Sequence, residues 1–153
     1  MEITYTIEGI EELVKKLESK ALLGQALRDI FNKATLTLQR NVQTRTKIDT
    51  GRLRGSITTE VDNAPLPKWG KVGTNTTYAP YVEWDTRPHW PPIAAITPWA
   101  HRHGISPFVV ALAISKHGTK GVHMFEQGLE ASKPDIDRIV DEAATTIEEK
   151  FSE

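Results

Sequence analysis

Histidines and acids gather in one part of this chain, and side chains of these types can hold a metal ion. His101 and His103 flank Arg102, while Asp85 and His89 lie upstream. Two histidines two positions apart on a helix point about 200° away from each other, so they cannot share one ion there. Zinc sites normally need four convergent ligands. The spacing therefore predicts no metal ligands, and nothing else in the chain indicates a cofactor.

Candidate nucleophiles are present, but none stands in a catalytic pattern. Ser56 or Ser106 could be combined with a histidine and an acid, and Glu83 with Asp85 forms a close acid pair. No Gly-x-Ser-x-Gly, phosphate-binding loop or His-Glu-x-x-His occurs. The absence of cysteine removes thiolate nucleophiles, thiolate metal ligands and disulfides together. We predict no catalytic residues and no enzymatic activity.

A basic segment at residues 40–54 could bind DNA phosphates. The net charge of the chain is −1, however, whereas dedicated DNA-binding domains usually carry a basic surplus. Cations also suit the C-terminal end of a helix dipole. A third reading pairs them with residues 134–153 of a neighbouring copy, which hold seven acids and two bases. A DNA-binding module therefore stays as the alternative function. The segment contains one acid, Asp49, and five cations: Arg40, Arg45, Lys47, Arg52 and Arg54.

The elements in the first half follow from the spacing of apolar residues. Alternation over residues 2–7 predicts a strand, and residues 10–17 show helical spacing. A longer stripe predicts a helix over residues 21–47, about 40 Å long. Residues 56–61 and 69–74 read as antiparallel strands joined by a loop that contains two prolines.

The second half is predicted to be helical. Residues 78–84 form a turn of helix or an aromatic corner, and short helices are expected at 93–100 and 108–117, on either side of Gly104. Residues 122–129 give a short apolar anchor, and Pro134 is expected to start the last helix. The prediction is an α+β fold, in which a small antiparallel sheet packs against a long helix and a C-terminal helix. Residues 1–153 form one domain, with 85–121 as a helical insertion.

Three short segments follow the long helix in order, and their glycines and aromatics indicate anchors of loops and turns. They are Thr50-Gly51-Arg52-Leu53-Arg54-Gly55-Ser56-Ile57, then Val72-Gly73-Thr74, then Tyr78-Ala79-Pro80-Tyr81-Val82-Glu83-Trp84-Asp85-Thr86.

These segments resemble the tail-completion, or head–tail joining, proteins of long-tailed bacteriophages, also described as minor tail or neck components. Members typically show Thr-Gly-x-Leu-x-x-Ser-Ile and Tyr-Ala-x-x-Val-Glu-Phe-Gly-Thr. In the second of these motifs, Trp84 replaces the phenylalanine and Asp85 replaces the glycine. The similarity covers roughly residues 45–130, and residues 91–122 resemble an insertion carried by one branch. The matching residues are Thr50, Gly51, Leu53, Ser56, Ile57, Gly73, Thr74, Tyr78, Ala79, Val82, Glu83 and Trp84.

The resemblance implies a structural virion protein that forms a ring of identical copies at the head-proximal end of the tail tube. Its partners would be the tail tube protein and the head connector, with DNA passing through rather than being bound specifically. It implies a location in the virion neck, and in the host cytoplasm during assembly. No stretch approaches the ~18 apolar residues of a membrane span, so no membrane partner is expected.

Aromatic and basic residues supply the candidate contacts. Tyr81 and Trp84 are expected in the core, whereas Trp90 and Trp99 fit core filling and interface anchoring equally well. Residues 50–57 and 85–121 are expected to become ordered or change course on docking. The interface candidates are Arg52, Arg54, Trp90, Trp99 and Lys120.

Overall fold

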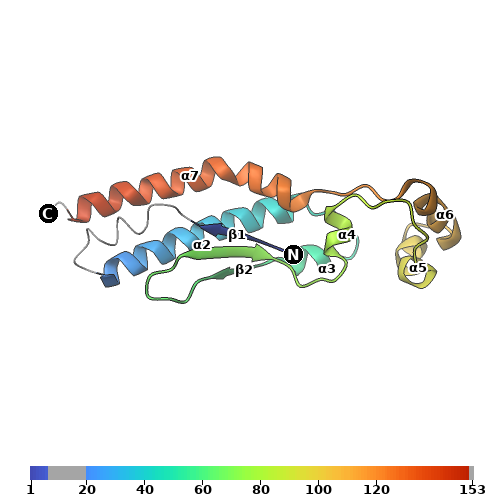
Figure 1. The fold of residues 1–153 in the computed structure, drawn as a ribbon, viewed down its shortest axis with the longest axis horizontal. Helices are drawn as coiled ribbons and strands as arrows, with labels where there is room; N and C mark the ends of the chain where they lie inside the picture. The colour runs from blue at the N-terminus through green and yellow to red at the C-terminus, as the bar shows by residue number, and fades with distance from the viewer. Residues whose placement is uncertain (7–19, 152–153) are drawn as a thin grey trace.

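A three-stranded antiparallel sheet lies along one long helix, as the computed structural model shows for residues 1–6 and 20–151 (Figure 1). The predicted α+β class is confirmed. The helix predicted at residues 10–17 lies outside the described residues. The elements are β1 (Glu2–Thr6), α2 (Lys20–Arg45), α3 (Arg52–Gly55), β2 (Thr58–Val61), β3 (Trp69–Gly73), α4 (Ala79–Glu83), α5 (Ile93–Arg102), α6 (Pro107–His117) and α7 (Met124–Phe151).

The sheet has the order β1-β3-β2, so the last strand along the chain is the central one. Ile3 and Thr59 lie opposite Val72 on either side. Val72 is fully buried and belongs to a core cluster with Leu38 and Val42 of α2. Buried and half-buried residues alternate along the central strand, and this alternation fixes which face of the sheet meets the long helix.

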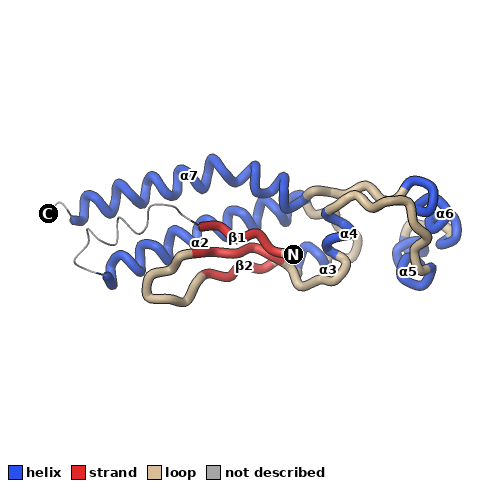
Figure 2. Tube along the Cα trace, viewed as in Figure 1, coloured by secondary structure: helices blue, strands red, loops and turns tan. Residues whose placement is uncertain are grey.

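The two long helices lie side by side along the length of the molecule (Figure 2). They approach closely at Gly128 of α7, where an added Cβ would stand 2.6 Å from the Cγ2 atom of Val42. A second core cluster, which includes Leu27, Phe31 and Ile147, continues the packing toward the far end. These two helices and the sheet form what we call the body.

The last helix begins earlier than the sequence predicted. Pro134 was expected to start it, but α7 runs unbroken from Met124, and Pro134 lies inside it on an exposed position. A proline inside a helix removes one hydrogen bond and crowds the preceding turn. Here Met124 and Phe125 before it and Ile136 after it are all buried. Packing on both sides of Pro134 therefore outweighs the local penalty.

Two further boundaries differ from the prediction. The strand predicted from residue 56 begins at Thr58, because residues 52–55 form the single helical turn α3. The helix predicted at residues 93–100 continues through Pro98 to Arg102. No helix in the described part of the chain is long and apolar enough to cross a membrane.

Helices α5 and α6 project from one end of the molecule, away from the body (Figure 1). Two extended segments connect them to α4 and α7 (Figure 2). We call residues 85–121, which hold α5, α6 and the two connecting segments, the arm. The opposite end is formed by the start of α2 and the end of α7 (Figure 1).

Candidate protein-interaction surface

The first motif segment fastens the end of α2 to the sheet. Gly51 has a φ of 81°, a left-handed conformation that glycine adopts without steric cost. Leu53 and Ile57 are buried in the core. The Ile57 carbonyl accepts a hydrogen bond of 2.7 Å from the side-chain amide of Gln39 on α2. These motif residues are structural anchors, and Arg52 and Arg54 between them remain exposed.

A cluster of hydroxyl groups joins the first motif segment to the second. The Oγ of Ser56 lies 2.6 Å from the Oγ1 of Thr74 and accepts a 2.7 Å hydrogen bond from the Oγ1 of Thr76. The backbone N–H of Thr74 donates to the carbonyl of Met1 at 2.9 Å. The end of β3 is therefore tied both to α3 and to the start of the chain.

Glu83 has a role that the sequence analysis missed. Its carboxylate is fully buried and accepts hydrogen bonds from the backbone N–H of Phe125 (3.0 Å) and of Glu126 (3.2 Å). The first N–H groups of a helix have no partner within the helix, and the helix dipole favours a negative charge there. Glu83 thus caps α7. Only the family motif pointed to this residue, because a cap 42 positions away leaves no local pattern.

The two connecting segments of the arm are bonded to each other. The Oγ1 of Thr86 accepts a hydrogen bond of 2.8 Å from the backbone N–H of Thr119. Asp85, which replaces a glycine of the motif, accepts one of 2.7 Å from the N–H of Gly121. Gly118 has a φ of 70°, and a Cβ there would clash with the Thr86 carbonyl. These bonds fix the direction in which the arm leaves the body.

The arm exposes most of its large apolar side chains. Its buried residues are all small: Pro91, Ala100 of α5 and Ala111 of α6. The Trp90 and Phe108 rings lie edge to face at 5.7 Å, and their side chains are 51% and 60% exposed. Such patches commonly mark protein–protein contacts. The exposed large apolar residues of the arm are Trp90, Ile93, Trp99, Ile105, Phe108, Val109 and Leu112.

A cleft of about 740 Å³ separates the arm from the body. The Arg102 guanidinium on α5 crosses it and donates a 3.0 Å hydrogen bond to Asp49, with a second bond from Nη2 to the other carboxylate oxygen. This interaction lowers the pKa of Asp49 from its ordinary value. Predicted site residues from the first motif segment, the third motif segment and the arm meet in this cleft: Thr50, Gly51, Arg52, Leu53, Tyr78, Val82 and Trp99.

Other predicted residues lie elsewhere. Trp90 lies against Phe108 rather than in the cleft, and Lys120 is exposed in the returning segment. The expectation that Tyr81 and Trp84 fill the core is wrong, because they are 67% and 49% exposed. The short helix α4 turns only one face toward the core, and Ala79 and Glu83 occupy that face. Trp84 instead contacts the His123 ring edge to face.

The basic segment is largely open to solvent. The described residues form no ion pair with any of its five cations, although Arg45 donates a 3.0 Å hydrogen bond to the carbonyl of Asn41. Arg40, Lys47, Arg52 and Arg54 are exposed. Within residues 1–6 and 20–151, no three histidine or acidic side chains are grouped as metal ligands would be.

This surface therefore combines buried anchor residues with exposed apolar side chains. A comparison with protein-family models, curated proteins and solved structures gave no match.

Proposed function

We propose that this chain is a structural assembly protein of the phage tail-completion, or head–tail joining, type. It closes the head-proximal end of the tail tube and docks to the head connector. The observation that carries the proposal is the arm, in which most of the large apolar residues face solvent while the buried residues are small. An arm built in this way is completed by contact with another protein.

The motif residues support the proposal through their places in the fold. Gly51, Leu53, Ser56 and Ile57 anchor the loop on one wall of the cleft, and Glu83 holds the base of the arm. A rigid base lets the arm meet its partner with little loss of conformational entropy. The same residues carry the resemblance to tail-completion proteins.

The test is removal of the chain from the particles that contain it. Particles assembled without it should contain separate heads and tails, visible by electron microscopy. Purified protein added back should bind isolated tail tubes and restore joining. Joined, infectious particles in the absence of this chain would overturn the proposal.

Limited proteolysis adds a second test. The arm should be cut within residues 85–121 in the free protein and protected in the assembled particle, because docking covers it. Equal rates of cleavage in both states would contradict a docking role for the arm.

DNA binding remains the second candidate because Arg40, Lys47, Arg52 and Arg54 are exposed and form no ion pairs with other described residues. The affinity for DNA should then fall steeply with salt. A plot of the logarithm of the binding constant against the logarithm of the salt concentration should have a slope of about −0.9 for each phosphate neutralised. Weak retention without such a slope would remove this candidate.

A further inference from the structure

The exposed apolar residues of α6 follow a helical spacing. Phe108, Val109 and Leu112 stand at positions i, i+1 and i+4 of the helix, and Ile105 lies two residues before its start; all four are exposed. Positions with this spacing form one continuous face of a helix. Helices that bind in grooves of partner proteins present apolar anchors on one such face. This face of α6 is therefore shaped to enter an apolar groove.

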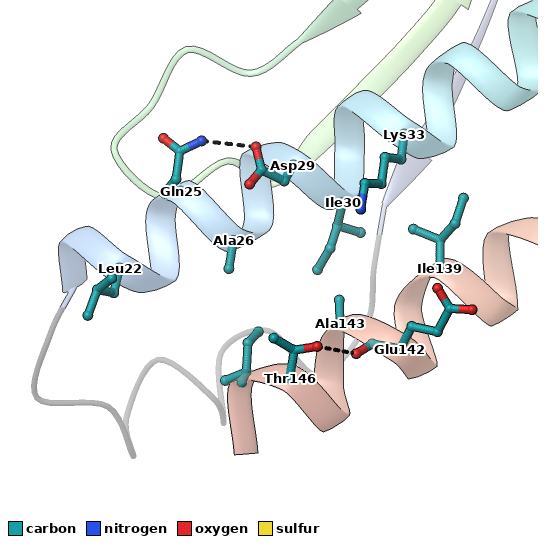
Figure 3. Close-up of a pocket in the computed structure, with 11 residues that line it drawn as sticks. Leu22, Gln25, Ala26, Asp29, Ile30, Lys33, Ile139, Glu142, Ala143 and Thr146 are labelled. Carbon is teal, nitrogen blue, oxygen red and sulfur yellow. Dashed lines mark hydrogen bonds between the residues drawn. The ribbon is translucent and has the colours of Figure 1, made fainter. Parts of the chain in front are cut away.

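The body has such a groove at its other end. It lies between α2 and α7 and has a volume of about 310 Å³. Ala26 and Ile30 of α2 point toward Ile139 and Ala143 of α7 across it (Figure 3). Leu22, at its open end, is 58% exposed. The polar rim consists of Gln25, Asp29, Lys33, Glu142 and Thr146.

The charges of the two surfaces are complementary. The arm, residues 85–121, contains one acid, Asp85, against four Lys or Arg residues. Residues 135–149, the segment of α7 that contains the residues lining the groove, hold six acids and one base. Opposite charges around an apolar contact steer association and fix its orientation. The arm is therefore matched electrostatically to the acidic half of α7.

The two surfaces of one molecule cannot meet. The arm lies at one end of the long axis, and the groove lies toward the other end, along the first half of α2 (Figure 1). We infer that α6 of one copy docks into the α2–α7 groove of a second copy of this chain. Such a contact joins two different surfaces, so repeated docking builds a closed ring or an open filament, depending on the angle between copies.

The inference rests on the proposed function only in taking the arm to be an assembly surface. It adds the two surfaces, α6 and the α2–α7 groove, through which copies of this chain would meet. Docking onto the tail tube or the head connector would then use other surfaces.

Engineered cysteines provide the test, since the chain has none of its own. The Val109→Cys variant is mixed with the Ala143→Cys variant, whose cysteine lies in the groove, and the mixture is oxidised. The matched control is Thr145→Cys, which is exposed on the same helix and does not line the groove. We expect the Val109–Ala143 pair to give at least about tenfold more disulfide-linked heterodimer than the Val109–Thr145 pair. Equal yields, or linkage of Val109→Cys to itself in preference, would overturn the inference.

A second measurement uses self-association directly. Phe108→Asp, with a normal groove, is mixed with Ala143→Trp, which fills the groove and keeps a normal α6. Each variant alone should stay monomeric at concentrations where the wild-type chain associates. The mixture should give heterodimers that grow no further, because one good contact remains. Heterodimers absent from the mixture, or a wild-type chain that stays monomeric at millimolar concentration, would contradict the docking.

The two proposals fail in different ways. If the crosslinks do not form but Phe108→Asp prevents joining of heads and tails, the arm binds another virion protein and only the inference falls. If the crosslinks form but particles join without this chain, self-docking stands and the phage role falls.

Discussion

The body and the arm use the same kinds of residue in opposite ways. In the body, Phe31 and Leu38 are buried between α2 and its neighbours. In the arm, Phe108 and Leu112 face solvent, and Ala100 and Ala111 fill the space between helices. The body is therefore held by its own hydrophobic core, whereas the arm is held by backbone hydrogen bonds in its connecting segments and by the Arg102–Asp49 interaction. The contrast separates a part built for stability from a part built for contact.

The largest effect is expected in the core of the body. Phe31→Ala removes a fully buried ring from the cluster between α2 and α7. Truncation of a buried phenylalanine costs about 4 kcal/mol, through lost burial and the cavity left behind. The free energy of unfolding, measured with urea, should fall by this amount. A loss below about 1 kcal/mol would show that this cluster is not the core of the fold.

A slightly smaller effect is expected where arm and body meet. Glu83→Ala leaves the Phe125 and Glu126 N–H groups at the start of α7 without their acceptor. Buried donors that lose a charged partner cost about 2–3 kcal/mol. The matched control, Glu130→Gln, changes an exposed acid of the same helix and should cost less than about 0.5 kcal/mol. Equal losses for the two variants would rule out the capping role.

The pH dependence of the Arg102–Asp49 interaction should give a smaller effect that is confined to the cleft. Because Arg102 lowers the pKa of Asp49 in the folded protein, the interaction is complete above the ordinary value of 3.8 and is lost as pH falls through the lowered pKa. The indole N–H signal of Trp99, which lines the same cleft, should then shift in NMR spectra as the pH falls below 3.8. In Asp49→Asn this transition should be missing. An unchanged transition in that variant would assign it to another group.

The smallest effect on stability is expected on the arm. Phe108→Ala should change the free energy of unfolding by less than about 0.5 kcal/mol, because its side chain is 60% exposed. It should nevertheless weaken self-association by at least about tenfold, as truncation of an interface anchor does. A stability loss as large as that of Phe31→Ala would end the distinction between body and arm.

Patterns within single elements predicted much of the body. Alternation identified β1, the apolar stripe identified α2, and Gly51 and Gly104 marked two turns with positive φ. These signals depend on neighbours in sequence. Pro134 misled the prediction, because tertiary packing of α7 against α2 outweighs a local preference that the sequence alone displays.

The functional surface was predictable only in part. Trp90 and Trp99 were singled out, and both are exposed on the arm. Tyr81 and Trp84 were misplaced, because a five-residue helix gives too short a period to show which side is buried. In α6 nearly every position is apolar, so its outward face could not be distinguished from its inward one. The capping by Glu83 depends on residues far apart in sequence.

The place where the arm joins the body also bears on how such proteins diversify. The chain leaves at Glu83 and returns at His123, and the N–H of His123 donates a 3.0 Å hydrogen bond to the Glu83 carbonyl. Because exit and return are hydrogen-bonded neighbours, a short turn can replace everything between them without stretching the backbone. Evolution could therefore acquire, exchange or discard this segment as a cassette. A protein engineer could use the same junction to graft a different recognition element onto an unaltered scaffold.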